Sequence, residues 1–306
     1  MLRSVILAAS RSARVKGLVQ HAPVSRGVVR RFVAGEGTED AVRGTGALQA
    51  SGLLVTLDHL GEDTTEQGQA EAAVKAYVTV LGRLAEEGLA AGAEVSLKLT
   101  AVGLDIARDL ATANAARIVE AAGEAGTTVT LDMEGSATTD ATLSVLAELR
   151  RAEPSVGAVV QAMLRRTEGD CRDLATPGSR VRLCKGAYRE GPDVAFASRA
   201  EVDASYARCL GVLMAGAGYP MVATHDPALV GLAERLVVRT GREAGSYELQ
   251  MLFGVRPDEQ RRLARAGHRV RVYVPYGHEW YGYLVRRLAE RPANLVFFAR
   301  ALATRS

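Results

Sequence analysis

The stretch RVRVYVPYGHEWYGYLVRRLAERPAN, residues 269–294, combines a strand and a helix in one short unit. Valines alternate with polar or aromatic residues over residues 270–274, and a period of two is typical of a β-strand with two different faces. We expect this strand to end at residues 275–277, where proline and glycine occur. From Trp280 onward, spacings of three and four between aromatic and charged residues predict a helix.

One face of this helix is expected to carry an aromatic ring, two guanidinium groups and a carboxylate. These are Tyr283, Arg286, Arg287 and Glu290. Residues three or four positions apart on a helix are neighbours. We therefore interpret the set as a candidate anion-binding site beyond the carboxyl end of the strand. The alternative is that both arginines are solvated and pair with Glu290.

The same strand–helix unit recurs upstream. Short apolar runs occur at residues 53–57, 95–99, 128–131, 156–160, 181–184, 221–223, 248–252 and 270–274. Helices are expected between them at residues 66–87, 105–125, 140–151, 200–217, 228–239 and 257–266. Strands that alternate with helices predict a parallel sheet, and eight such strands close into a (β/α)8 barrel. A doubly wound open sheet is the alternative, but no strand is followed by its G-x-G-x-x-G motif.

The domain organisation predicted from this pattern is an α/β fold of the TIM-barrel type. An N-terminal helical arm is expected at residues 1–50 and the barrel at residues 51–306, with a glycine-containing linker at residues 35–46. Residues 1–35 carry seven Lys or Arg and no acidic residue. We interpret them as a structural arm; the second interpretation is an arm that contacts an anionic membrane surface.

Bulk composition excludes several classes of protein. A net charge of +3 over 306 residues is too small to indicate a nucleic-acid partner. The sequence has no run of eighteen apolar residues, so no membrane-spanning helix is expected. Three cysteines without C-x-x-C spacing predict a reducing compartment, without disulfides and without a metal site of the zinc type. We therefore expect a cytoplasmic protein, with peripheral contact at the inner face of the membrane as the second interpretation.

Polar residues occur at or near the carboxyl end of every predicted strand. They are Asp58 and Glu62, Lys98, Asp132 and Glu134, Gln161, Arg182 and Lys185, Thr224, His225 and Asp226, Glu248 and Gln250, and Tyr273. Barrel interiors are commonly filled by apolar layers, whereas active sites lie at the carboxyl ends of the strands. We therefore expect an apolar interior and a ring of polar groups around the barrel mouth.

The residue types in this ring leave more than one chemistry open. Lys98 or Lys185 suits a Schiff-base lysine of a non-redox lyase or aldolase. Carboxylates and His225 suit a divalent metal, but three cations in the ring argue against one, and we predict no metal. The same cations suit an anionic flavin and a carboxylate substrate. The residues alone do not decide between the lyase and the flavoprotein.

Several motifs together carry a family resemblance. They are LDHLGE at residues 57–62, SLKLTAVG around Lys98, LDMEG around Asp132, VRLCKGAY around Lys185, ATHD around His225, ELQMLFG around Gln250, and RVYVPYG followed by WYGYLVRRLAERPAN. With them the chain resembles proline dehydrogenase of the bacterial, monofunctional type. The resemblance implies a distorted (β/α)8 barrel that binds FAD and oxidises L-proline to Δ1-pyrroline-5-carboxylate, the first step of proline catabolism to glutamate. It also implies hydride transfer to flavin N5, a membrane quinone as electron acceptor, and a separate pyrroline-5-carboxylate dehydrogenase.

The resemblance also assigns roles to single residues. Asp132 corresponds to the active-site carboxylate and Arg182 to the arginine that contacts flavin N5. The substrate-binding residues are Lys98, Leu252, Tyr273, Tyr283, Arg286 and Arg287. Glu62 corresponds to a gate that pairs with Arg286. The cofactor-binding positions are Met133, Gln161, Arg182, Lys185, Gly186, Ala187, Tyr188, Thr224, His225, Gln250 and Glu290.

Overall fold

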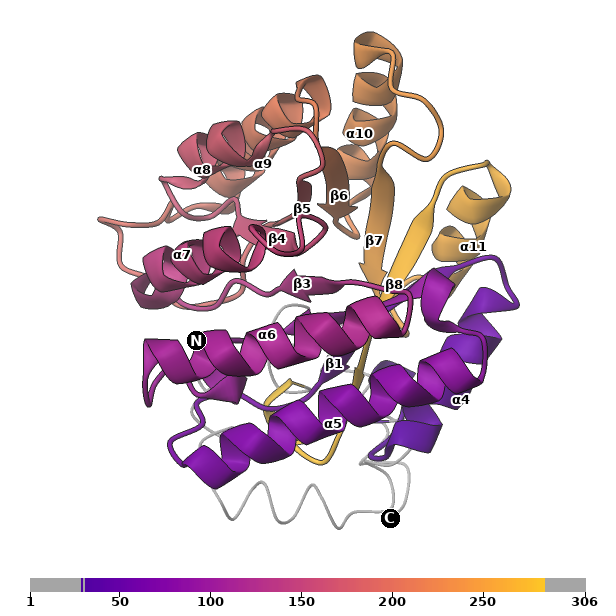
Figure 1. Cartoon of the computed structure of the whole chain (residues 1–306). Coiled ribbons are helices and arrows are strands. Elements are labelled where there is room, and N and C mark those ends of the chain that lie inside the picture. Colours follow the sequence, from indigo (N-terminus) through magenta and orange to yellow (C-terminus); the bar gives the residue numbers. More distant parts are fainter. Residues whose placement is uncertain (1–28, 30, 284–306) are drawn as a thin grey trace, which may run out of the picture.

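The structure, a computed structural model, describes residue 29 and residues 31–283. Within this range eight parallel strands form a closed barrel in chain order, and β1 pairs with β8 to complete it (Figure 1). The strands are β1 (Leu54–His59), β2 (Ala93–Leu97), β3 (Val129–Leu131), β4 (Gly157–Gln161), β5 (Arg180–Cys184), β6 (Tyr219–Ala223), β7 (Glu248–Leu252) and β8 (Val270–Tyr276). The (β/α)8 barrel expected from the sequence is confirmed.

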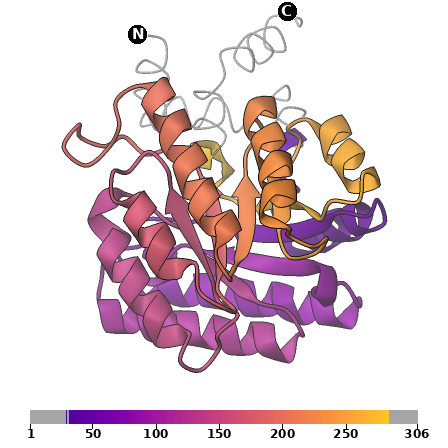
Figure 2. The same cartoon turned by 90° about the horizontal axis from the view of Figure 1, so that it is seen from above.

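Helices cover the outside of this barrel, as Figures 1 and 2 show. They are α4 (Thr38–Gln49), α5 (Gln67–Glu86), α6 (Arg108–Glu124), α7 (Thr139–Leu149), α8 (Thr167–Leu174), α9 (Arg199–Ala215), α10 (Pro227–Thr240) and α11 (Pro257–Arg265). Short 3-10 turns are η1 (Ala90–Gly92), η2 (Thr100–Val102) and η3 (Ser136–Thr138). The six helices expected between strands are present with shifted ends. Helix α8 was not expected, because its sequence TEGDCRDL is polar and buries only Thr167 and Cys171.

The large hydrophobic core lies between the strands and the helices rather than inside the barrel. On β2, Val95 and Leu97 are fully buried members of that core. The alternate residues Glu94 and Ser96 are also buried, and they bond to side chains from other strands of the barrel. The apolar barrel interior expected from the sequence is therefore wrong. On β2 the period of two sends Val95 and Leu97 outward and Glu94 and Ser96 inward.

Helix α4 corrects the linker expected at residues 35–46, because most of that stretch is helical. The helix packs on β1, β8 and α5, so it covers the seam where the barrel closes. Ala41 and Val42 of α4 belong to the same core as the strands. Residues 1–28 of the expected arm lie outside the described residues.

Strand β8 runs beyond the end expected for it. Pro275 pairs with Asp58 of β1 in register, and Tyr276 follows as the last residue of the strand. Pro275 lacks an N–H, but its carbonyl accepts a hydrogen bond from the Ala34 N–H at 3.0 Å. The Tyr276 carbonyl accepts another from the Leu60 N–H at 2.8 Å. The ladder therefore continues through the proline.

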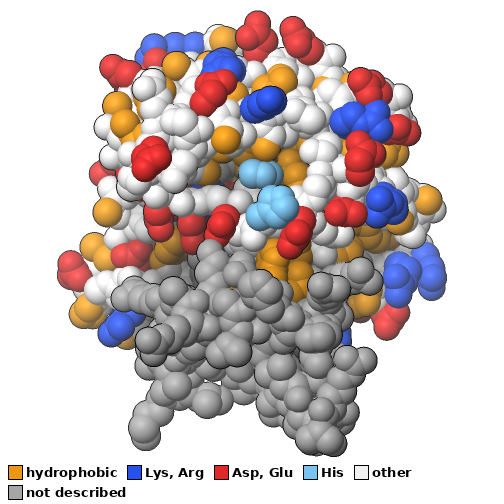
Figure 3. Space-filling model, turned by 90° about the horizontal axis from the view of Figure 1, so that it is seen from below, with side chains coloured by type: hydrophobic (Ala, Val, Ile, Leu, Met, Phe, Trp, Pro, Cys, Tyr) orange, Lys and Arg blue, Asp and Glu red, His pale blue; other side chains and the backbone are white. Residues whose placement is uncertain are grey.

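In the described part of the chain, no helix is both long and apolar enough to cross a bilayer. On the face shown in Figure 3, acidic and basic side chains are interspersed rather than separated into patches of one sign. This distribution agrees with the small net charge, and the described residues form no extended basic surface on that face.

Candidate active site

Four side chains from β1, from β8 and from the residues just after β2 and β3 form what we call the mouth cluster: Asp58, Tyr273, Lys98 and Asp132. The Lys98 ammonium lies 2.7 Å from Asp58 Oδ1 and 3.8 Å from Asp132 Oδ2. The Tyr273 hydroxyl donates to Asp132 Oδ2 at 2.6 Å. Barrel closure makes β1 the neighbour of both β2 and β8, and this brings together residues that are far apart in sequence.

The charges of the mouth cluster follow from burial and from these partners. Burial opposes the charge on Lys98, but the carboxylates of Asp58 and Asp132 outweigh it and raise the pKa of the amine above its ordinary value. Burial raises the pKa of Asp58, while Lys98 acts in the opposite direction. Burial and the nearby Asp132 carboxylate raise the pKa of Tyr273 well above its ordinary value. Lys98 is therefore an ammonium and Tyr273 a neutral hydrogen-bond donor.

Arg182, on β5, has an acceptor for each N–H of its guanidinium. The acceptors are Gln250 Oε1 at 2.6 Å, Ser96 Oγ at 2.8 Å, Asp132 Oδ1 at 2.9 Å, Glu94 Oε1 at 2.9 Å and Thr56 Oγ1 at 3.4 Å. The guanidinium also lies over the Tyr273 ring, 5.3 Å from its centroid. Arg182 is only 4% exposed, and it joins the mouth cluster to the centre of the barrel.

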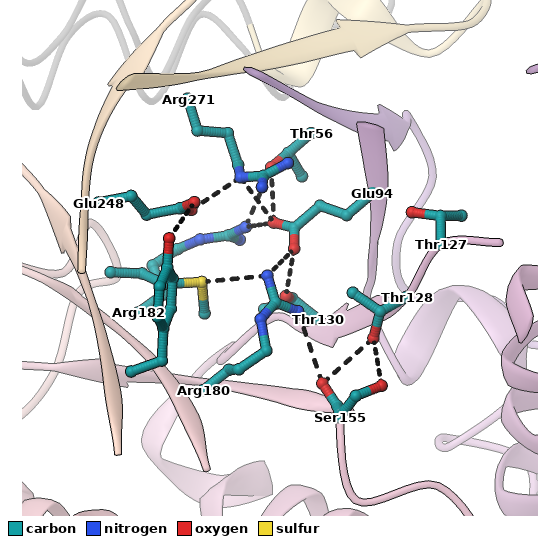
Figure 4. Close-up of polar contacts among 12 residues, drawn as sticks. Thr56, Glu94, Thr127, Thr128, Thr130, Ser155, Arg180, Arg182, Glu248 and Arg271 are labelled. Carbon is teal, nitrogen blue, oxygen red and sulfur yellow. Dashed lines mark hydrogen bonds and ion pairs between the residues drawn. The ribbon is translucent and has the colours of Figure 1, made fainter. Parts of the chain in front are cut away.

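Deeper in the barrel lies a second set of charges, which we call the interior network: Glu94, Arg180, Glu248 and Arg271 (Figure 4). Glu94 Oε2 accepts from Arg180 at 2.5 Å, and Glu248 Oε1 accepts from Arg271 at 2.7 Å. Burial disfavours the charged form of Glu94, but the surrounding arginines outweigh it and hold the pKa of this carboxyl well below its ordinary value. Glu94 is therefore a carboxylate in the middle of the barrel.

The interior network and the mouth cluster balance in charge when Arg182 is added. The carboxylates are Asp58, Glu94, Asp132 and Glu248, and the cations are Lys98, Arg180, Arg182 and Arg271. Buried charges are tolerated when they are paired and hydrogen-bonded. Sequence reasoning missed Glu94, Arg180 and Arg271. The signal was present, because each occupies an inward position in the alternation of its strand.

The positions expected to bind a cofactor lie mainly at the ends of β4, β5, β6 and β7. The Gln161 amide donates to the Glu134 carbonyl at 2.7 Å. His225 Nε2 accepts from the Leu252 N–H at 2.8 Å, so Nε2 is the unprotonated nitrogen of a neutral ring. The Thr224 hydroxyl accepts from the Asp226 N–H at 3.1 Å. The first contact joins the end of β4 to the loop after β3, the second joins the loop after β6 to β7, and the third lies within the loop after β6.

Gly186 and Lys185 follow β5 and belong to the same region. Gly186 has a φ of +100°, and a Cβ there would lie 2.5 Å from the Met163 sulfur. Both features favour glycine at this position. The Lys185 ammonium pairs with Asp226 at 3.2 Å and also with Asp203. Asp226 in addition caps helix α10, because its Oδ1 accepts from the Ala228 N–H at 3.1 Å.

Some of the remaining expected residues are described by the structure, and others lie outside the described range. Met133 is buried, Gln250 bonds to Arg182, and Ala187, Tyr188 and Leu252 are partly buried near the same strand ends. Tyr283 is buried at the end of the described range, and Glu62 is partly buried in the loop after β1. Arg286, Arg287 and Glu290 lie outside the described residues, and so does the partner that the gate at Glu62 requires.

The described carboxylates of this region do not form a metal site. Among residue 29 and residues 31–283, no group of three or more His, Cys, Asp or Glu side chains is arranged to hold a metal ion. The cations around Asp132 and Glu94 already neutralise the carboxylates that a metal would need.

A (β/α)8 barrel with paired acids and bases at the carboxyl ends of its strands defines the class of barrel enzymes. Comparison with known proteins narrows this class. Residues 41–300 match the family model described as proline dehydrogenase. The chain belongs to the proline dehydrogenase family, and it is an oxidoreductase that acts on proline. The resemblance noted in the sequence motifs is confirmed.

The relatives agree with this assignment over nearly their full length. The chain is 36% identical over 302 residues to proline dehydrogenase 1 of Bacillus subtilis, covering 99% of each chain. It is 37% identical over 282 residues to a proline dehydrogenase of Deinococcus radiodurans, covering 90% of each. Among solved structures, proline utilization A from Bdellovibrio bacteriovorus superposes with a TM-score of 0.80 at 25% identity. That match covers 87% of this chain and 33% of the longer protein.

Proposed function

We propose that this chain oxidises L-proline to Δ1-pyrroline-5-carboxylate using bound FAD and passes the electrons to a membrane quinone. Membership of the proline dehydrogenase family supports the reaction. The observation that carries the proposal further is the mouth cluster, in which Asp58 and Asp132 hold the buried Lys98 ammonium in its charged form. A fixed cation at the barrel mouth suits a substrate with a carboxylate.

The residues at the ends of β4 to β7 fit FAD. They offer a cation in Lys185, hydrogen-bonding groups in Gln161, Thr224 and His225, and a glycine backbone at Gly186 where a side chain would collide. A pyrophosphate needs cations and close backbone approach, and this set of groups supplies both. We propose that these residues hold FAD, together with Met133, Arg182, Ala187, Tyr188, Gln250 and Glu290. When bound, the flavin supplies the electron acceptor for the hydride of proline.

Arg182 is proposed to act on the flavin mainly through its charge. Each of its N–H groups already has an acceptor inside the barrel. A direct bond from Arg182 to flavin N5 therefore requires that one donor be shared. A fixed guanidinium beside the flavin favours its anionic reduced form, because opposite charges attract more strongly where water is excluded. Asp132 Oδ1 accepts from this guanidinium at 2.9 Å, and Asp132 Oδ2 accepts from the Tyr273 hydroxyl at 2.6 Å.

The substrate is proposed to sit above the mouth cluster. Lys98, Arg286 and Arg287 would bind the proline carboxylate, because charge-assisted contacts orient a small anion. Leu252, Tyr273 and Tyr283 would form the wall against the ring. C5 would give up a hydride to the bound flavin and the ring nitrogen would release one proton to solvent, so that the nitrogen lone pair forms the C=N bond with C5.

Glu62 is proposed as a gate that pairs with Arg286 and holds the last helix over the site. It lies in the loop between β1 and α5, next to the strand that closes the barrel. Closure of this kind excludes water during hydride transfer. Peripheral contact with the inner face of the membrane, by way of the basic N-terminus, would bring the flavin close to the quinone. A separate pyrroline-5-carboxylate dehydrogenase would consume the product.

The alternative function, a non-redox lyase with a Schiff-base lysine, is disfavoured by the charges of the two candidate lysines. A Schiff-base lysine must be a neutral amine to attack a carbonyl. Two carboxylates raise the pKa of Lys98, and Lys185 is paired with Asp203 and Asp226. These ion pairs stabilise the ammonium form of both lysines, which is not nucleophilic.

Anaerobic titration tests the proposed function. Purified protein reconstituted with FAD should be yellow, and L-proline should bleach its absorbance near the flavin maximum. Addition of a quinone analogue should then restore the colour. Protein that binds FAD but is not bleached by proline would contradict the proposal. Covalent trapping of a carbonyl substrate at Lys98 or Lys185 by borohydride would instead support the lyase.

A further inference from the structure

We propose that Glu94 is a positioning residue for proline oxidation: it fixes the guanidinium of Arg182 from inside the barrel and so sets the geometry of Asp132 at the mouth. This inference rests on the proposed function for its kinetic effect. Glu94 belongs to none of the expected site residues. It lies on β2, below the mouth cluster, and is fully buried.

The first observation is that Arg182 is held between two carboxylates. One terminal nitrogen donates to Asp132 Oδ1 at 2.9 Å, and the other donates to Glu94 Oε1 at 2.9 Å. Without the Glu94 carboxylate, that second nitrogen keeps only the Thr56 hydroxyl, at 3.4 Å. A planar guanidinium bonded to a carboxylate on each side cannot rotate without breaking a charge-assisted bond. Glu94 and Asp132 therefore fix its plane together.

The second observation is that Glu94 is itself rigidly held. Its Oε2 accepts from Arg180 at 2.5 Å and from the Thr130 hydroxyl at 3.2 Å. Its Oε1 accepts from the Thr56 hydroxyl at 2.7 Å. Side chains from three other strands, β1, β3 and β5, thus hold this one carboxylate of β2, and Figure 4 shows them around it. Because Glu94 is fixed in this way and bonds directly to Arg182, it also fixes the position of the Arg182 guanidinium.

A parallel contact supports the same reading. The Gln250 amide donates to Glu248 Oε1 at 2.6 Å, and this orientation turns its carbonyl oxygen toward the Nε–H of Arg182. The interior network therefore holds Arg182 at two places, through Glu94 and through Gln250. Pairing with Arg180 and Arg271 alone would be enough to neutralise Glu94. The additional bond to Arg182 links the network to the site.

The charge balance gives this role a signature distinct from folding. Loss of the Glu94 charge leaves one excess cation near Asp132 and Arg182, in a part of the barrel that excludes water. An excess cation lowers the pKa of neighbouring acids. It also favours the reduced, anionic form of a nearby flavin. A contribution to folding alone would produce neither change in protein that is still folded.

The test compares Glu94→Gln, which keeps the shape but loses the charge, with Arg242→Met as a matched control. Arg242 donates to four backbone carbonyls outside the barrel, so its loss should lower stability without touching the site. In Glu94→Gln we expect kcat to fall tenfold or more, while KM for proline stays within threefold of the parent value. The loss of one charge-assisted bond corresponds to a change of roughly 10- to 150-fold in rate. The acid limb of kcat against pH should move to lower pH. Arg242→Met should keep the parent kcat and pH profile.

Two further measurements keep the outcome decisive. The double variant Glu94→Gln/Arg180→Gln removes one carboxylate and one cation, so the barrel interior stays neutral and folding is favoured. Its kcat should still be low, because Arg182 lacks its bond to the Glu94 carboxylate. A crystal structure of either Glu94 variant should show the Arg182 guanidinium rotated away from its present contact with Asp132. The proposal is overturned if both Glu94 variants keep the parent kcat, or if Arg182 stays in place. If the parent protein does not transfer electrons from proline to an artificial dye, the proposed function is wrong. The position of Arg182 in the crystal structure of the Glu94 variant then tests the role of Glu94 without any activity measurement.

Discussion

Lys98→Met tests the central ion pair of the mouth cluster, because it removes the ammonium and keeps most of the apolar stem. Lys98 is 8% exposed and its partner Asp58 only 1%. The substitution leaves the Asp58 carboxylate buried, without its bond of 2.7 Å and with Asp132 as a neighbouring charge of the same sign. An unpaired charge in such a place is among the few point changes with a large effect on stability.

The expected loss can be set against the whole stability of a domain. Removing one partner of a buried ion pair costs about 3–5 kcal/mol, whereas complete domains are stable by about 5–15 kcal/mol. For a chain of this length, each kcal/mol lost from the free energy of unfolding lowers the melting temperature by about 2–4 °C. The variant should therefore unfold about 6–20 °C below the parent.

The loss should also depend on pH in a definite direction. Burial already raises the pKa of Asp58, and loss of Lys98 removes the charge that opposes this. A carboxyl whose folded pKa lies above its unfolded value of about 3.9 contributes stability that is present at low pH. That contribution is lost as the pH rises through the folded pKa. The deficit of Lys98→Met relative to the parent should thus be smaller at low pH than at high pH.

Chemical unfolding at several pH values between about 5 and 8 measures this deficit, with Asp58→Asn combined with Lys98→Met as the control. The double variant has no unpaired carboxylate at residue 58, so it should recover at least half of the lost free energy. A deficit below about 1 kcal/mol, the range of exposed ion pairs, would refute the reasoning. So would a large deficit that neither varies with pH nor responds to Asp58→Asn.

Further predictions concern other parts of the site. Tyr273→Phe removes the bond of 2.6 Å to Asp132 and should lower kcat/KM for proline roughly 10- to 150-fold; steady-state kinetics with unchanged values would contradict it. Gly186→Ala, at a φ of +100°, should lose about 1–3 kcal/mol of stability in denaturant unfolding, and a variant as stable as the parent would show that glycine is not required. Burial lowers the pKa of His59 to about 4, so the stability that neutral His59 contributes is present above about pH 6.5 and is lost as the pH falls. His59→Phe should make the free energy of unfolding decline less steeply between about pH 6.5 and 4, and an unchanged slope of that free energy against pH would exclude this role. Glu62→Ala should raise KM for proline if the gate exists, whereas a KM within about twofold of the parent at equal flavin content is the result for a weak exposed pair.

The barrel was predictable because its strands and helices differ in period. Runs such as residues 248–252 alternate or are short and apolar, and the helices between them repeat at three and four, so element type and order follow from sequence. The helix α8 was not predictable in the same way. It is short and buries only Thr167 and Cys171, and so its sequence has no apolar period. Its existence depends on packing beside α9 rather than on local pattern.

The site was predictable at its rim and not at its centre. Lys98, Asp132 and Tyr273 stand near strand ends within specific motifs, and the structure brings them together. Glu94 and Arg271 stand within strands, where an apolar interior was the ordinary expectation. Their partners lie on other strands: Glu94 of β2 pairs with Arg180 of β5, and Arg271 of β8 pairs with Glu248 of β7. Local alternation could mark them as inward-facing, but pairing of opposite charges depends on the register around the whole barrel.

The balanced charges inside the barrel have a consequence for how this sequence can vary among its relatives. Four carboxylates and four cations share one enclosed volume, so a single substitution that changes charge there leaves an uncompensated ion. Neutral drift at one such position is therefore blocked unless a second position changes as well. Where a homologue has an uncharged residue in place of Glu94, we expect Arg180 or Arg271 to be replaced too. The outward faces of the same strands contribute to the hydrophobic core between strands and helices, and they should vary one residue at a time. Covariation among relatives should thus link the inward-facing residues of the barrel strands and not the outward-facing ones, although the two sets alternate along the same strands.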